Sequence, residues 1–261
     1  MADQTAAAPA PEGSPELVHY DVADSVATVT LDSPHTRTAL SRQLVTELVD
    51  RIERAGADPE VKVVLLVSSG RVFCSGADLS EASAGGMDEG TRRIVALQRL
   101  IVTLDKPVVV AVAGAVRAGG IGIVAAADVA VVAEEATFAL TEVKLGLAAA
   151  IISLTVHARM NPRAAALTTL GGEVFTGADA AAYGLVTRAV PAAGLDDAVA
   201  TVCAQLATGA AQGLRESKRI LNAELVRRID DLGADMAALS ARLFASDEAR
   251  EAMTAFLERK K

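Results

Sequence analysis

Three stretches that are apolar throughout limit what this chain can fold into. They read VVLLV from residue 63, VVVAV from residue 108 and VAVVA from residue 129. A strand with one face in water alternates apolar and polar residues, so strands without alternation belong in a sheet covered on both faces. Segments with helical spacing, at about 91–104 and ending near residue 127, separate them. We therefore expect an α/β fold with a buried parallel sheet.

The flanking segments predict the organisation of the remaining chain. A hairpin around Asp24 and Ser25 precedes a helix that Ser41 caps and Gly56 closes. Thr176 caps a short helix, and four helices are expected after about residue 194. We predict a disordered tail over 1–15, an α/β core over 16–193 and a helical region over 194–261.

Composition and charge exclude several classes of protein. The 33 acidic residues outnumber the 25 basic ones, which disfavours nucleic-acid binding. Cys74 and Cys203 form no disulfide framework, which fits a reducing cytoplasm, and the three histidines form no metal-binding cluster. The N-terminus does not resemble a signal peptide, and no apolar stretch is long enough to span a membrane. We expect a cytoplasmic protein that binds neither metal nor membrane.

Glycines gather where a helix is expected to begin. In the segment AVRAGGIGIV, Gly119, Gly120 and Gly122 each weaken a helix by about 1 kcal/mol. Bare backbone at a helix start lets an anion approach free N–H groups. The segment matches neither GxxxxGK[ST] nor GxGxxG, so a nucleotide site is disfavoured. Tight helix packing and binding of an oxyanion remain as explanations.

A second loop of small residues favours the oxyanion. The segment VFCSGADL also follows a buried strand and offers Ser75, Gly76 and Ala77. Because parallel strands end at one edge of a sheet, the two turns could aim two N–H groups at one point. Two converging donors are what an oxyanion hole requires.

Four segments resemble one family in both sequence and spacing. FCSGADL, AVAGAVRAGGIGIVAAADVAVV, FALTEVKLGL and FTGADAAAYGLV are similar to segments of the crotonase superfamily, the enoyl-CoA hydratase/isomerase family. The resemblance runs from about Leu17 to the end of the chain. It implies a spiral of ββα units, a C-terminal helical region that forms trimers or hexamers, and an acyl-CoA substrate without a separate cofactor. By this resemblance, the backbone N–H groups of Ala77 and Gly119 hold the thioester oxygen.

The resemblance also implies residues that bind coenzyme A. Thr38 replaces the usual Asn of the segment around HTRTALS, where Arg37 would meet a phosphate or remain a solvated turn residue. The other expected contacts with substrate or coenzyme A are Ala39, Ser75, Gly76, Asp78, Leu79, Gly120, Phe256 and Lys260.

One family carboxylate is present and one is missing. Glu142 takes the position of one catalytic glutamate, and its apolar neighbours should raise its pKa toward neutrality. The other position is Gly122, which carries no proton. Glu142 alone could therefore drive hydration, as expected in the branch that includes methylglutaconyl-CoA hydratases. Alternatively, Glu142 isomerises a double bond, or the protein binds acyl-CoA without turnover.

Two further departures concern the acyl group. Arg117 stands where the family has an apolar residue, and it would pair either with a carboxylate of a glutaconyl-type substrate or with a protein carboxylate. Residues 148–152 replace a Pro and Gly-rich turn and would line a differently shaped acyl pocket.

Overall fold

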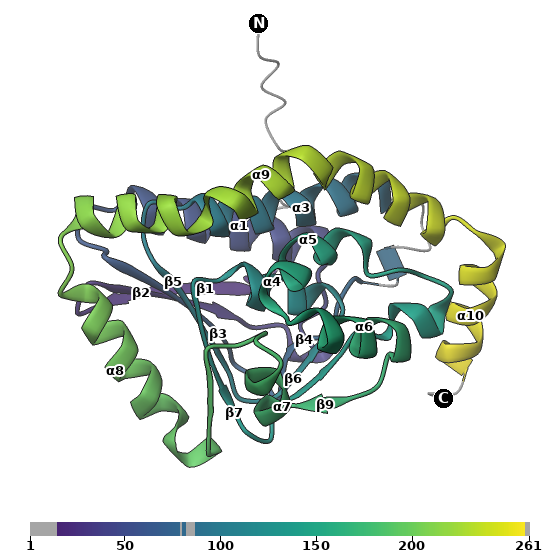
Figure 1. Ribbon diagram of the computed structural model, residues 1–261, viewed down its shortest axis with the longest axis horizontal. Helices are drawn as coiled ribbons and strands as arrows, with labels where there is room; N and C mark the ends of the chain where they lie inside the picture. Colours follow the sequence, from purple (N-terminus) through teal and green to yellow (C-terminus); the bar gives the residue numbers. More distant parts are fainter. Residues whose placement is uncertain (1–14, 79, 82–86, 259–261) are drawn as a thin grey trace, which may run out of the picture.

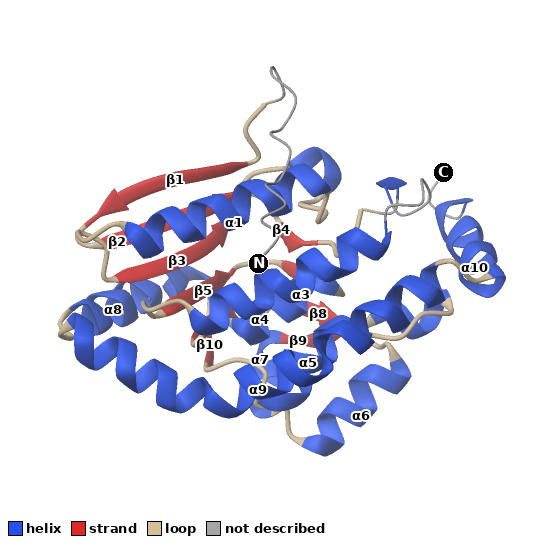
Figure 2. Cartoon of the chain, turned by 90° about the horizontal axis from the view of Figure 1, so that it is seen from above, coloured by secondary structure: helices blue, strands red, loops and turns tan. Residues whose placement is uncertain are grey.

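Two sheets form the centre of the chain. The computed structural model describes residues 15–78, 80–81 and 87–258. The larger sheet has the strand order β1-β2-β3-β5-β7-β10, and the smaller one has the order β4-β6-β8-β9. Figure 2 shows β1, β2, β3 and β5 of the larger sheet following one another. Its strands are Val18–Ala23, Val26–Leu31, Val63–Ser68, Val108–Val112, Val129–Ala133 and Arg188–Val190.

The chain passes repeatedly from the larger sheet to the smaller one. The three predicted apolar strands β3, β5 and β7 pair in parallel. Each is followed after a short turn by a strand of the smaller sheet, and then by a helix. The short strands are β4 (Val72–Cys74), β6 (Ala115–Arg117) and β8 (Thr137–Ala139), and β8 also pairs with β9 (Phe175–Thr176). This repetition is the ββα spiral that the resemblance implied.

Helices cover the sheets on both sides. Helix α9 lies across α3 and α5 along one side of the molecule, and α8 packs against β3, β5 and β7 (Figure 1). No helix in the described part of the chain is long and apolar enough to cross a membrane. The helices are α1 (Arg42–Ala57), α3 (Met87–Thr103), α4 (Gly119–Ala126), α5 (Ala150–Arg159), α6 (Pro162–Gly171), α7 (Gly177–Ala182), α8 (Leu195–Ala207), α9 (Ala211–Phe244) and α10 (Asp247–Glu258).

Several helix boundaries follow the predicted caps, and two expectations were wrong. Ser41 accepts a hydrogen bond from the Leu44 N–H, and Thr176 forms a capping box. Helix α1 continues one residue past Gly56. The C-terminal region holds three helices in the described residues instead of four, because α9 runs unbroken over 34 residues. Contacts with α3 and α5 along its length support the continuous helix.

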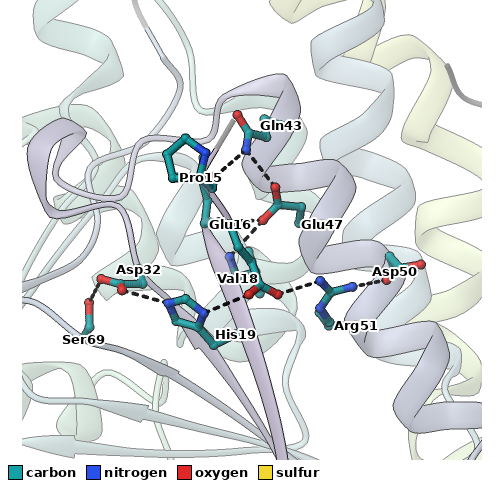
Figure 3. A network of polar contacts seen from close by, with 11 residues as sticks. Pro15, Glu16, Val18, His19, Asp32, Gln43, Glu47, Asp50, Arg51 and Ser69 are labelled. Atoms are coloured by element: carbon teal, nitrogen blue, oxygen red, sulfur yellow. Dashed lines mark hydrogen bonds and ion pairs between the residues drawn. The ribbon is translucent and has the colours of Figure 1, made fainter. Parts of the chain in front are cut away.

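The first described residues are fastened to α1. Glu47 accepts hydrogen bonds from the N–H groups of Leu17 and Val18, and Glu16 pairs with Arg51 (Figure 3). His19 lies between the carboxylates of Glu16 and Asp32, and these partners raise the pKa of its ring. These contacts fix the strand β1 at the edge of the sheet. Most of the predicted tail, residues 1–14, lies outside the described residues.

A buried ion pair connects α9 to the α/β layers. The Lys218 Nζ lies 2.7 Å from an Asp128 carboxylate oxygen and donates to the carbonyls of Ile101 and Lys106. Asn222 also donates to Asp128, which in turn accepts from the Val108 N–H. A buried ammonium is stable only with such a full set of acceptors.

We predict that Lys218→Met lowers the free energy of unfolding by about 3–5 kcal/mol, because it leaves Asp128 without its cation. Urea denaturation measures the change. Arg219→Met is the matched control on the same helix, since Arg219 is exposed and its loss should change stability by less than about 0.5 kcal/mol. Equal stabilities of the two variants would contradict a stabilising role for the ion pair.

Candidate active site

The two predicted turns lie in contact. Gly76 adopts a φ of 94°, and its carbonyl accepts a hydrogen bond of 2.8 Å from the Leu40 N–H. Gly119 begins α4 directly after Ala118, whose φ of 46° is unusual for a residue with a side chain. A Cβ added to Gly76 would lie 3.7 Å from the Gly119 nitrogen. Within the described residues, no acceptor is bonded to the N–H of Ala77 or Gly119.

The glycines are required by this close approach. A Cβ on Gly76 would lie 2.8 Å from the Ala118 Cβ, and one on Gly119 would lie 2.8 Å from the Leu40 side chain. Gly120 sits directly above Cys74, whose Cβ would be 2.6 Å from an added Cβ. Burial raises the pKa of the Cys74 thiol to about 12, so this side chain is an unreactive filler.

Two cavities meet at these turns. One has a volume of about 370 Å³, and the other, more cationic one has a volume of about 1010 Å³. The residues that line both are Ala77, Asp78, Ala118, Glu142 and Phe244. We call the smaller one the acyl cavity, because the predicted residues 148–152 line it together with Gly119. We call the larger one the CoA cleft, after the ligand that the resemblance predicts; its wall carries Arg37, Arg117 and Lys144.

Glu142 lies where the two cavities join. It belongs to the short 3-10 helix Thr141–Leu145, which β8 places beside the two turns. Its Oε2 is buried and has no hydrogen-bond partner in the described residues. Burial raises the pKa of this carboxyl to about 7, and a hydrogen bond from its own backbone N–H opposes the shift. The group can therefore accept and return a proton near neutral pH.

The space beside Gly122 is filled. A Cβ at this position would lie 2.5 Å from the Ile152 Cγ2 and 3.2 Å from the Gln98 Oε1. Gln98 is fully buried, and its Oε1 accepts a hydrogen bond of 2.7 Å from the Thr155 hydroxyl. The position at which the resemblance implied a second carboxylate is therefore closed by its packed neighbours.

Three of the remaining predicted residues line the CoA cleft, and none of those described lines the acyl cavity alone. Ala39, Ser75 and Arg37 line the CoA cleft, whereas Gly76 and Gly120 are buried. Arg37 is exposed and has a left-handed backbone conformation, with a φ of 56°, at the end of a 3-10 turn. Leu79, Lys260 and the side chain of Phe256 lie outside the described residues.

One of the two roles expected for Arg117, a protein salt bridge, is absent from the described residues, and the other, pairing with a substrate carboxylate, stays a prediction. Its guanidinium donates to the carbonyl and hydroxyl oxygens of Thr137 and to its neighbour's carbonyl. No described carboxylate lies within ion-pair distance, so the expected salt bridge is wrong. Its side chain links β6 to β8 in the wall of the CoA cleft, away from the acyl cavity.

Sequence reasoning missed the contribution of α9. Ser240 and Phe244 reach the acyl cavity from the end of this long helix. Both residues are far along the chain from the four segments that carry the resemblance, so the sequence did not predict that they line the cavity. Gln98 and Thr155 were likewise missed, since each reads as an ordinary helix residue.

Stacked ββα units with converging turns define a crotonase-type protein. A solved enoyl-CoA hydratase from Mycobacterium avium superposes with a TM-score of 0.88 at 43% identity, over 94% of this chain and 98% of that one. A second, from Mycobacterium avium subsp. paratuberculosis, gives 0.84 at 33% identity, over 93% and 96%. The model of the enoyl-CoA hydratase/isomerase family matches residues 21–261. The chain belongs to this family.

The filled space beside Gly122 gives a packing prediction. Gly122→Ala should destabilise the protein by about 1–3 kcal/mol, because the new methyl overlaps Ile152. Adding Ile152→Val should recover part of this loss. Gly213→Ala in α9 is the matched control, since an added Cβ meets nothing within 4 Å. Urea denaturation measures the free energy of unfolding of each variant. A Gly122→Ala variant as stable as this control would show that the site has room for a methyl group.

The raised pKa of Glu142 gives a prediction for stability against pH. The folded protein holds this proton up to about pH 7, whereas an ordinary glutamate releases it near 4.5. Folding therefore loses stability as pH rises between these values, and the loss stays constant above them. Glu142→Gln mimics the protonated form, so it should be more stable than the wild type at pH 8, with the difference shrinking toward pH 4.5. Thermal unfolding at several pH values measures this, and a pH-independent difference would contradict it.

Proposed function

We propose that the chain is an enoyl-CoA hydratase-like lyase in which Glu142 is the sole acid and base. The observation that carries this proposal is the buried, unpartnered Glu142 carboxyl beside the free N–H groups of Ala77 and Gly119. Its cavity continues into a cleft with cationic walls. The hydratase names of the solved relatives support the same reaction.

The two N–H groups act on the thioester oxygen. As water adds to the β-carbon of an enoyl thioester, the electron pair of the double bond moves toward this oxygen. Preorganised donors stabilise the resulting enolate, and one such donor typically contributes about 3–4 kcal/mol. Ala77 and Gly119 supply these donors from backbone that the neighbouring glycines hold in place.

Glu142 moves one proton in two steps. As the carboxylate, it takes a proton from water while the water oxygen bonds to the β-carbon. As the carboxylic acid, it then gives this proton to the α-carbon of the enolate, and the 3-hydroxyacyl thioester forms. A pKa near 7 suits both steps, because neither form of the group is strongly disfavoured at neutral pH.

The charged part of the substrate would lie in the CoA cleft. Arg37, Arg117 and Lys144 line this cleft, and guanidinium and ammonium groups pair well with phosphates. Phe256 and Lys260 stay predicted contacts of a neighbouring subunit's coenzyme A. Trimer or hexamer assembly, the methylglutaconyl-type branch and a cytoplasmic location stay predictions as well.

One observation favours a second candidate, double-bond isomerisation. Ile152 and Gln98 fill the place of a second carboxylate that would help to hold water. A single carboxyl can instead take a proton from one carbon of the substrate and return it to another, through a dienolate whose oxygen the same two N–H groups would hold. This reaction needs no water.

Glu142→Gln should lower kcat by about 100- to 10,000-fold, because the amide can neither accept nor return the proton. A panel of straight and branched enoyl-CoAs, followed by mass spectrometry, measures turnover. A mass gain of one water reports hydration, and a shifted double bond without mass change reports isomerisation. Glu135→Gln is the control, because this exposed carboxyl lies outside both cavities. Unchanged turnover in Glu142→Gln would remove Glu142 from the mechanism, and binding without turnover would identify a non-catalytic acyl-CoA-binding protein.

A further inference from the structure

The acyl cavity contains a buried hydroxyl that the proposed reaction does not use. Ser240 is only 4% exposed and lines this cavity from the last turns of α9. Its hydroxyl makes no hydrogen bond within the described residues, and its oxygen is not among the fully buried unpartnered atoms, so it stays accessible from the cavity. Several other hydroxyls of this chain's helices donate to a backbone carbonyl of their own helix, as Ser153 does to Ala150 at 2.7 Å. The Ser240 hydroxyl therefore remains available to a group inside the cavity.

An unpaired hydroxyl in the cavity wall distinguishes between acyl groups. A hydrocarbon placed against Ser240 would shield its hydroxyl from water and leave it without a partner, which is unfavourable. An oxygen atom on the acyl chain would instead pair with it. Recognition of this kind discriminates strongly, because the analogue that lacks the oxygen leaves the protein's polar group unpaired.

The charges around the cavity indicate which oxygen function fits. Arg42 and Arg93 both pair with Glu89, at 3.1 and 2.6 Å. Glu81 accepts a hydrogen bond from the backbone N–H of Arg42. The carboxyl groups in the cavity wall, those of Asp78, Glu81, Glu89 and Glu142, outnumber these two guanidinium groups. An additional carboxylate on the acyl chain would meet an excess of like charge, whereas an uncharged oxygen would not.

We infer that Ser240 is a specificity-determining residue that hydrogen-bonds an uncharged oxygen function, a hydroxyl or a ketone, on the acyl chain of the substrate. The inference rests on the proposed function, because it places the acyl chain in this cavity. Ser240 can both donate and accept, so it suits either group. A hydrogen bond between neutral groups should favour the oxygen-bearing substrate by about three- to tenfold.

The experiment compares 2-enoyl-CoA thioesters of one chain length whose acyl ends carry a methyl, a hydroxyl, a keto or a carboxylate group. The measured quantity is kcat/KM for each, and the dissociation constant of the matching saturated thioester is determined in parallel. The wild type should prefer the hydroxyl or keto compound over the hydrocarbon, and Ser240→Ala should reduce this ratio toward one. Ser153→Ala is the control, since that hydroxyl is engaged within α5 and does not line the cavity, and it should retain the wild-type ratio.

Equal kcat/KM values for the hydrocarbon and oxygen-bearing compounds in the wild type would overturn the inference and leave the proposed function intact. A preference for the carboxylate would also overturn it, and would assign the acyl end to Arg42 and Arg93. If no compound is turned over, the proposed function fails. The dissociation constants then still decide the role of Ser240, because a hydrogen bond in this cavity strengthens binding of the saturated oxygen-bearing thioester whether or not chemistry follows.

Discussion

The contact between two strand-ending turns is the constraint on which the rest of the site depends. Gly76 and Gly119 approach so closely that neither can carry a Cβ without displacing a neighbour. This contact brings the N–H groups of Ala77 and Gly119 to the wall of one cavity. Ala118 adopts a left-handed φ between them, a conformation that costs about 1–3 kcal/mol and persists only where surrounding structure enforces it. The hydrogen-bonded strands β4, β6 and β8 supply that enforcement.

Two groups with restricted access to water, the Lys218 ammonium and the Glu142 carboxyl, are stabilised in opposite ways. Lys218 has an ion-pair partner and two carbonyl acceptors, so its charge is compensated and α9 is held in place. Glu142 is buried with one oxygen lacking any described partner, and its pKa rises to about 7 as a result. The first arrangement stabilises the fold. The second lowers stability at neutral pH and leaves a group able to exchange protons, which is the usual relation between stability and an active site.

Packing closes the position at which the resemblance implied a second carboxylate. Ile152 and Gln98 occupy the space that Gly122 leaves, and Thr155 satisfies the buried Gln98 amide oxygen. A glutamate introduced at position 122 would therefore require several neighbours to change with it. The arrangement makes Glu142 the carboxyl on which the proposed chemistry depends, and Ser240 and the paired arginines give the acyl cavity a polar character of its own.

The sequence alone determined the α/β class, the three central strands and the segments at which the site would form. Each of these features restricts the residue types of one short segment. Burial on both faces requires an apolar strand, and close backbone approach requires small residues in a turn. It also predicted Glu142 as the catalytic carboxyl, and it places a glycine at position 122. Only the tertiary structure decided that Arg117 binds Thr137 instead of a carboxylate, that Gln98 and Ile152 fill the vacant place, and that α9 brings Ser240 to the cavity. These features are contacts between residues far apart in the chain. Such contacts form only after folding, and no local sequence pattern predicts them.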